Sequence, residues 1–394
     1  MKTLAISLLC ILARMELVSV IEVGVSGARS PNLDMPPGEF YESGLNELTP
    51  IGVRQQYLLG FYHKQTWSRL FLDSNYNEYQ VYVRSINTNS SIMSCYAHTM
   101  GLYKVNSAET LTPAQIRLAR PPVFNDSIFP YLETILGSYP LPYKLYPIPT
   151  HVFNPEIDPL AVDICPTANR QIGDEYMNST EVDQLMKDYS DSINDVKTTY
   201  NFPEALVGKL MLPDIIYDIY AAHFDSRALG LHPVTVSRML ELGNKMAPYA
   251  YCGKLDSNAC KLLAHNLNAY LIDIADDIVY DYVHKAKEER RCYTLLMTSD
   301  KMFVALLKSW GYMMDKMVPP ASFLLISISR KDEHEATQAS DFSVKVTLST
   351  EKGKAPMNLP ICTNGACDMP TYLSSMEKVL IKTSNITKDC SLTN

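Results

Sequence analysis

The chain has 394 residues, of which 46% are hydrophobic and 20% are charged, and its formal net charge is −8. This length and balance predict a packed globular protein of one large domain or two. The sequence contains no run rich in lysine and arginine. Nucleic acid is therefore excluded as an expected partner.

Residues 1–13 predict a secretory signal peptide. Lys2 supplies the charged start, residues 4–13 form an apolar core, and the small Ala13 suits cleavage. The alternative interpretation is a buried first strand that is not cleaved. The apolar core is too short to cross a bilayer, and no other apolar run reaches about 18 residues. We therefore expect a secreted or lumenal protein, in a compartment of lysosomal or vacuolar type, that does not span a membrane.

Cysteines and glycosylation sequons agree with that compartment. Of nine cysteines, Cys10 lies in the predicted signal peptide and eight remain. An even number in an oxidising compartment predicts disulfides, although spacing alone leaves their connectivity open. Sequons of the form Asn-x-Ser/Thr predict N-linked glycans at four positions, namely Asn89, Asn125, Asn178 and Asn385.

The first predicted strand runs into a glycine-rich turn. Residues 17–21 are apolar and rich in β-branched side chains, and residues 24–31 read Gly-Val-Ser-Gly-Ala-Arg-Ser-Pro. An apolar strand that breaks at glycines and then offers an arginine is typical of a ligand site at the carboxyl end of an open α/β sheet. The glycines let the backbone approach a ligand, and Pro31 ends the extended segment.

A helix and a second strand follow. Thr49 predicts an N-cap and Pro50 the first residue of a helix that continues to Gly60. Residues 80–85 alternate as a strand does, and residues 92–103 predict a helix packed on the sheet.

The middle of the chain predicts a helical insertion. Residues 110–165 are rich in proline and predict an extended, irregular segment. Helical periodicity then appears near 182–198, 204–222, 234–247 and 256–290. Residues 110–290 are therefore interpreted as a mostly helical cap, inserted into an α/β core of residues 14–109 and 291–394.

The chain then returns to the core. Residues 293–298 predict a buried strand, residues 301–311 a helix, and residues 321–330 with 341–349 a hairpin. The predicted fold class is α/β, with an open doubly wound sheet and the helical cap inserted into it.

In this order, the motifs resemble those of the histidine acid phosphatases, whose first strand ends in Arg-His-Gly-x-Arg-x-Pro. Gly27, Arg29 and Pro31 match that pattern. Val25 stands at the position of the family's first arginine, and Ser26 stands at the position of its nucleophilic histidine.

The other family motifs are also partly kept. The family's Arg-Ser-Thr-Asp-x-x-Arg keeps Arg84 and Ser85, whereas Ser90 replaces the second arginine. The later Ser-Ala-His-Asp junction keeps Asp300 but has Ser299 in place of the histidine that protonates the leaving group. The resemblance further implies a homodimer and two disulfides, which pair Cys165 with Cys390 and Cys362 with Cys367.

The resemblance implies hydrolysis of phosphomonoesters through a phosphohistidine, with arginines binding the phosphoryl oxygens. Ser26 cannot replace that imidazole, because a serine hydroxyl needs a neighbouring base and Ser299 is not one. We therefore predict a catalytically inactive pseudophosphatase that serves as a binding or interaction glycoprotein. The retained Arg29, Arg84 and Asp300 are candidates for binding a phosphate-bearing or other anionic ligand, and neither a cofactor nor a metal is predicted.

Three alternatives stay open. The arginines make only salt bridges, Arg29 with Asp300; or the chain is an active acid phosphomonoesterase with a non-standard nucleophile; or it is a structural glycoprotein without a ligand. His223 and His232 flank a loop of the cap and are the histidines that a recruited active site would use. Asp281-x-x-His284 has the spacing of a bundle metal site but lacks a second motif, so it predicts a solvated acidic face.

Overall fold

The computed structural model describes residues 15–34, 36, 41, 44–67, 76–103, 110–121, 129–142, 147–203, 206–254, 257–331, 336–350, 357–362, 365–383 and 385–392. The predicted signal peptide lies outside the described residues, as do Asn125 and His334.

A mixed sheet of eight strands forms the centre of the fold, in the order β3-β2-β4-β1-β5-β6-β7, with β8 also paired to β6. The strands are β1 (Glu16–Val25), β2 (Val81–Ser85), β3 (His151–Val152), β4 (Tyr293–Thr298), β5 (Phe323–Arg330), β6 (Phe342–Ser349), β7 (Met357–Asn358) and β8 (Ala366–Asp368). The strands from β3 to β1 run parallel, and β5 and β6 continue the sheet as an antiparallel hairpin. The predicted α/β class is confirmed.

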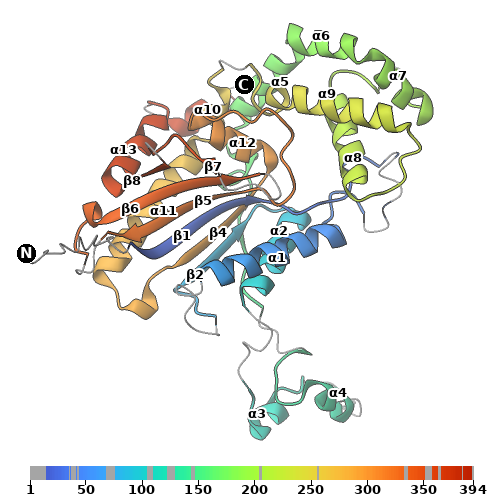
Figure 1. The fold of residues 1–394 in the computed structure, drawn as a ribbon. Coiled ribbons are helices and arrows are strands. Elements are labelled where there is room, and N and C mark those ends of the chain that lie inside the picture. Colours follow the sequence, from blue (N-terminus) through green and yellow to red (C-terminus); the bar gives the residue numbers. More distant parts are fainter. Residues whose placement is uncertain are drawn as a thin grey trace, which may run out of the picture.

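Helices cover both faces of this sheet, as Figure 1 shows. The helices are α1 (Pro50–Thr66), α2 (Asn89–Leu102), α3 (Pro113–Leu118), α4 (Phe129–Leu136), α5 (Pro166–Met177), α6 (Thr180–Asp188), α7 (Ser190–Thr199), α8 (Leu212–Phe224), α9 (Pro233–Cys252), α10 (Ala259–Leu263), α11 (His265–His284), α12 (Asp300–Ser309), α13 (Met369–Val379) and α14 (Ile386–Cys390). α1 and α2 lie on one face, and α11, α12 and α13 lie on the other.

The alternation of side chains along β1 explains these layers. Ile21 and Val23 point into a core shared with α11 and α12, whereas Val20 points into a core shared with α2. Because successive residues of a strand face opposite sides, one apolar strand supplies both cores.

The cap has a hydrophobic core of its own. This core is built from α6 to α9 and includes Val182, Ile216 and Met239. α11, which the sequence assigns to the cap, instead contributes Leu271 and Ile274 to the core against the sheet. The boundaries of the cap stay a prediction, and this packing is a reason to end it before α11.

The proline-rich segment is less irregular than expected. Residues 110–165 were predicted to be extended, but they contain the short helices α3 and α4. Thr112 and Gln115 form a capping box that starts α3. Both helices lie apart from the cap, beyond the layer of α1 and α2 (Figure 1).

Of the disulfides in the described chain, one joins segments 225 residues apart and two are local. Cys165 pairs with Cys390 and Cys362 pairs with Cys367, as the resemblance implies. A further disulfide that the sequence left open joins Cys252 to Cys260. Across the residues that the structure describes, no helix has the length and apolar character needed to cross a membrane.

Glycines bring α1 and α2 into backbone contact. A Cβ at Gly60 would lie 2.0 Å from the carbonyl oxygen of His98, and a Cβ at Gly101 would lie 2.1 Å from that of Tyr57. A methyl group at either position would therefore overlap backbone that has no rotamer through which to move away.

We expect Gly60→Ala to lower the free energy of unfolding by about 1–3 kcal/mol, because the helices must separate to admit the methyl group. Gly173→Ala is the matched control, since Gly173 is an exposed residue inside α5 and a Cβ there meets nothing within 4 Å. This variant should gain roughly 0.5–1 kcal/mol from helix propensity. Urea unfolding measures both, and equal midpoints for the two variants would contradict the packing argument.

Candidate functional site

The register of two parallel strands places both serines at the same edge of the sheet. Val25, the last residue of β1, lies opposite Thr298, the last residue of β4. Ser26 and Ser299 therefore follow neighbouring strand ends, where open α/β sheets bind ligands. The site predicted at the end of β1 is thus formed by two strands that are far apart in the sequence.

The turn after β1 is fixed by its contacts with α1 and α2. A Cβ at Gly27 would lie 2.4 Å from the carbonyl oxygen of Gly52, so this turn and the start of α1 touch through their backbones. Thr49 caps α1 as predicted and also donates a hydrogen bond to the carbonyl oxygen of Ala28. The Gly27 amide donates to the Ser94 hydroxyl on α2. These bonds hold Arg29 at a defined place.

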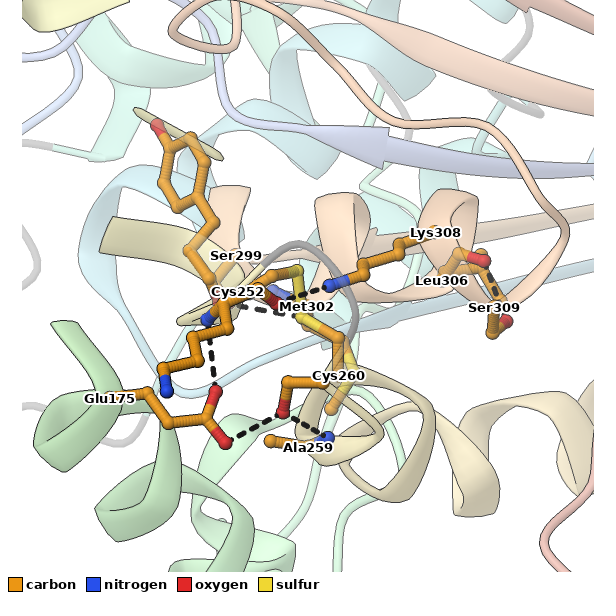
Figure 2. The surroundings of a disulfide bond; sticks show 12 residues. Glu175, Cys252, Ala259, Cys260, Ser299, Met302, Leu306, Lys308 and Ser309 are labelled. Carbon is orange, nitrogen blue, oxygen red and sulfur yellow. Dashed lines mark hydrogen bonds between the residues drawn. A yellow bond between two sulfur atoms is a disulfide. The ribbon is translucent and has the colours of Figure 1, made fainter. Parts of the chain in front are cut away.

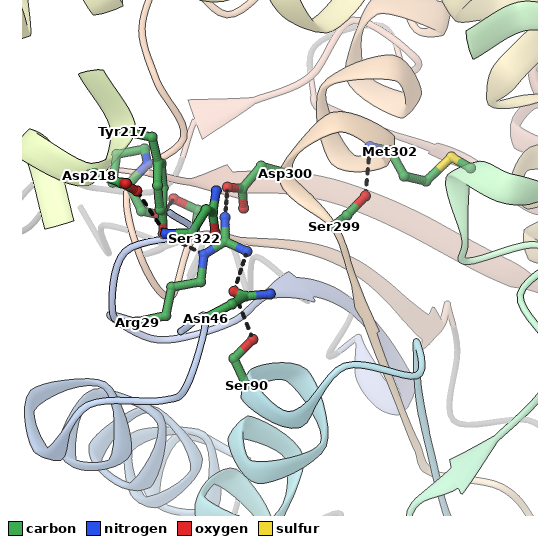
Figure 3. A network of polar contacts seen from close by, with 11 residues as sticks. Arg29, Asn46, Ser90, Tyr217, Asp218, Ser299, Asp300, Met302 and Ser322 are labelled. Atoms are coloured by element: carbon green, nitrogen blue, oxygen red, sulfur yellow. Dashed lines mark hydrogen bonds and ion pairs between the residues drawn. The ribbon is translucent and has the colours of Figure 1, made fainter. Parts of the chain in front are cut away.

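Arg29 is the centre of a polar network (Figure 3). Its Nη2 lies 2.5 Å from Oδ2 of Asp300, its Nη1 donates to Asn46 at 3.3 Å, and its Nε donates to the Tyr217 hydroxyl. Ser90 donates a long hydrogen bond, 3.5 Å, to the same Asn46 side chain. The ion pair with Asp300 is the salt bridge that the alternative interpretation of Arg29 predicts.

Among the described residues, neither serine hydroxyl is hydrogen-bonded to a histidine or a carboxylate. The Ser299 hydroxyl accepts a hydrogen bond from the backbone N–H of Met302 at 3.2 Å and so caps α12. Ser26 is 5% exposed, and its carbonyl oxygen accepts from the Ala321 N–H. Val25 is packed in the core and offers no donor to a ligand. Val25 therefore serves packing, and Ser299 serves capping.

Arg84 does not join this network. Its Nη2 lies 2.8 Å from Oδ1 of Asp158, and its guanidinium lies 4.0 Å from the centre of the Phe153 ring. Both charged groups are buried, so each neutralises the other. The structure thus brings Arg29 and Asp300 together, and it places Arg84 apart from them. Ser90, where the family has its second arginine, lies closer to the network than Arg84 does.

A cavity of about 250 Å³ lies between this edge of the sheet and the cap. It is lined by Arg29, Asn32, Pro213, Asp214, Ile216, Tyr217, Gly243, Met246, Ala247, Ala250, Tyr251, Ser299, Asp300, Lys301 and Met317. Most of the residues from α8 and α9 are apolar, whereas the residues from the core, apart from Met317, are polar or charged. Such a cavity fits a ligand with one polar and one apolar end.

Burial shifts the titration of several groups at the cavity. It raises the pKa of Tyr217 to about 12, although Arg29 opposes this shift. Burial also lowers the pKa of Lys301 to about 8, against the attraction of Asp163. The pKa of Asp214 is raised, again because burial disfavours the charged carboxylate. Tyr217 therefore faces Arg29 as a neutral phenol.

No described histidine lines the cavity. His223 and His232 are both exposed, and neither is among the residues that line the cavity. His63 and His98 are fully buried on α1 and α2, on the far side of the sheet from α12. An imidazole for proton transfer is therefore absent from this part of the described chain.

The third disulfide supports the wall of the cavity (Figure 2). Cys252 ends α9, directly after Tyr251, and is bonded to Cys260 on α10. Beside it, Glu175 accepts hydrogen bonds from the Lys254 N–H and the Ser257 hydroxyl, 2.9 and 2.8 Å long. The end of α9 is thus fixed against α10 and α5. Sequence spacing alone does not identify this pair.

The cap is also bonded to the turn after β1. Asp218, next to Tyr217 on α8, accepts hydrogen bonds from the backbone N–H groups of Asn32 and Leu33 at 2.7 and 3.1 Å. Burial raises the pKa of Asp218 to about 7, although these two bonds oppose the shift.

Comparisons with known proteins agree with this geometry. No family model matches the sequence. The chain is 23% identical over 371 residues to lysosomal acid phosphatase of Xenopus laevis, covering 90% of this chain and 74% of that protein. It is 33% identical over 102 residues to prostatic acid phosphatase of Homo sapiens, covering 25% of this chain and 26% of that protein.

Solved structures match over nearly the whole chain. The phytase from Citrobacter braakii has a TM-score of 0.63 at 12% identity, covering 96% of this chain and all of that one. The Hafnia alvei phytase in complex with tartrate has a TM-score of 0.59 at 14% identity, covering 96% and 99%. The fold is therefore that of the phytases and acid phosphatases. Together with the sequence matches, it supports the resemblance to the histidine acid phosphatases.

The raised pKa of Asp218 makes stability depend on pH. Between about pH 4 and pH 7, folded Asp218 keeps a proton that the unfolded chain has released, so the free energy of unfolding falls as the pH rises. Relative to Asp218→Asn, the wild type should lose roughly 1–3 kcal/mol between pH 4.5 and pH 7.5. Urea unfolding at the two pH values measures this, with the exposed Asp277→Asn as the control. An equal pH response in both variants would show that Asp218 is ionised throughout.

Proposed function

We propose that this chain is a catalytically inactive histidine acid phosphatase that acts as a binding protein. The observation that carries the proposal is the pair of serines at the family's two histidine positions, of which Ser299 uses its hydroxyl to cap α12. A covalent phosphoryl transfer needs a nucleophile activated by a base or by a lowered pKa. Ser26 is buried, and none of the described histidines lines the cavity.

The remaining charged groups support binding better than catalysis. Asp300, the residue left from the family's proton-donating pair, is held by Arg29 at 2.5 Å. A ligand that carries a phosphate or carboxylate would compete with Asp300 for the guanidinium, so we expect weak binding. The apolar residues of α8 and α9 would then contact the rest of the ligand.

One observation favours the alternative of an active phosphomonoesterase. Lys301 lines the same cavity as Ser299, and its lowered pKa, about 8, leaves part of its amines unprotonated near neutral pH. A neutral lysine can act as the base for a serine nucleophile. Activity by this route would depend on Lys301 and would rise with pH towards 8.

The proposed compartment rests on the same likeness. We propose that the chain enters the secretory pathway and is secreted or held in a lysosome-like lumen. Its disulfides and its similarity to a lysosomal acid phosphatase support this proposal. Asn89, Asn178 and Asn385 are exposed and so accessible to glycosylation. The homodimer stays a prediction.

We expect the wild type to hydrolyse an aryl phosphate no faster between pH 4 and pH 8 than Ser26→Ala does. The variant Ser26→His/Ser299→His/Ser90→Arg should exceed the wild type at least ~100-fold, because it restores a nucleophile, an acid and a phosphate ligand. A second version adds Val25→Arg, and its thermal melting must be checked because Val25 is packed in the core. Wild-type turnover that disappears in Ser26→Ala or Lys301→Met would establish the active alternative.

Binding is tested separately, by melting temperature. Phosphate or tartrate at millimolar concentration should raise the melting temperature of the wild type, because a ligand selective for the folded state stabilises it. Arg29→Gln should abolish this rise. Arg227→Gln is the control, because Arg227 is exposed and lies outside the cavity lining. No rise in the wild type would favour a structural glycoprotein whose cavity holds no anion.

A further inference from the structure

A second cluster of titratable side chains lies in the core, on the opposite side of the sheet from α12. It consists of Glu22 on β1, His63 on α1 and His98 on α2, each at most 1% exposed. One ligand atom from each residue lies within 4.8 Å of the other two. None of the three lines the cavity. A carboxylate in the middle of a central strand is costly unless a cation or a set of donors compensates it.

The spacing of the three ligand atoms suits one small cation. Oε2 of Glu22 lies 2.9 Å from Nδ1 of His63 and 3.8 Å from Nε2 of His98. Zinc binds histidine nitrogen and carboxylate oxygen at about 2.0–2.2 Å, so two ligands of a tetrahedral site lie about 3.3 Å apart. The two observed distances lie on either side of that value.

The carboxylate of Glu22 does not satisfy the hydrogen-bonding capacity of the His63 ring. Neither of its ring nitrogens has a hydrogen-bond partner among the described residues, although the side chain is fully buried. Its Nδ1 lies close to Oε2 of Glu22, but this contact does not meet the geometry of a hydrogen bond. The ring is held by stacking on Trp67, with 4.3 Å between ring centres. A nitrogen and an oxygen that are close but not aligned with each other are typical of two ligands directed at a third atom.

A neutral His98 ring has one hydrogen, which is too few for its two polar contacts. Its Nδ1 lies 3.3 Å from Oε1 of Gln56, whose amide nitrogen already donates to the Val25 carbonyl, so Nδ1 must carry the hydrogen. Nε2 is then a lone pair, 3.0 Å from the Tyr293 hydroxyl. That hydroxyl donates its one hydrogen to Glu22 at 2.5 Å. A neutral ring therefore leaves the contact between Nε2 and the Tyr293 hydroxyl without a hydrogen.

We propose that Glu22, His63 and His98 bind one divalent transition-metal ion of the zinc type within the core. Two imidazoles and a carboxylate are a ligand set that zinc accepts, and the hydrogen bond from Tyr293 would orient the carboxylate. The ion would be structural, because the cluster lies between the sheet and the helices α1 and α2, away from the cavity. It would therefore bind as the core forms. The sequence predicts no metal, and the three ligands share no local motif.

The test is the metal content of the full chain, expressed without a polyhistidine tag in medium that contains zinc. Plasma mass spectrometry should find about one zinc per chain in the wild type. Glu22→Gln and His98→Gln should each reduce that content at least ~10-fold after dialysis. His284→Ala, which removes an exposed histidine on α11, is the control for adventitious metal and should leave the content unchanged. Metal-free wild type, or metal that persists in both core variants, would overturn the proposal.

A second measurement holds even if the single variants do not fold. The wild type is unfolded and refolded with a chelator, and its melting temperature is compared before and after zinc is added. The expected result is a melting temperature that rises with zinc, together with visible cobalt absorption when cobalt replaces zinc. Glu22→Leu/His63→Leu/His98→Leu should show neither response. Identical melting of the wild type with chelator and with zinc would show that the cluster is a buried ion pair without a metal.

Discussion

The parallel pairing of β1 with β4 is the constraint on which the rest of this structure depends. Its register, from Val20 opposite Tyr293 to Val25 opposite Thr298, decides which side chains become neighbours on three surfaces. At the strand ends it sets Ser26 beside Ser299. On one face it gives Ile21 and Val23 to the core under α11 and α12, and on the other it sets Glu22 near Tyr293. A shift by one residue would exchange the two faces and place the carboxylate against α12.

The features that the sequence predicts well are those carried by local patterns. The capped start of α1, the strand before Ser299 and the β5–β6 hairpin each depend on residues that are adjacent in the chain. The pairings of Cys165 and Cys362 came from the family likeness, because spacing does not determine connectivity. The proline-rich segment was less well predicted: capping by Thr112 starts a helix that a count of prolines does not reveal.

Contacts between segments that are far apart in the chain could not be predicted from the sequence. Arg29 and Tyr217 meet only because the cap folds back over the sheet, and nothing local to either residue indicates it. Arg84 matches the family motif, yet its partner Asp158 lies in a segment whose path the sequence did not predict. The cluster around Glu22 is hidden for the same reason, since its histidines lie on two separate helices. Buried charge within an apolar strand is the one signal that would have indicated it.

The contacts of Arg29 also connect two bodies of the protein. Its guanidinium is bonded to Asp300 of the core and to Tyr217 of the cap, and Asp218 holds the turn that carries it. A ligand that binds the guanidinium would compete with Asp300 and would do so beside the bond to Tyr217 that joins the cap to the core. Occupancy of the cavity and the position of α8 are thus coupled through Arg29. Such a joint would convert the presence of a ligand into a change of shape that a partner can recognise.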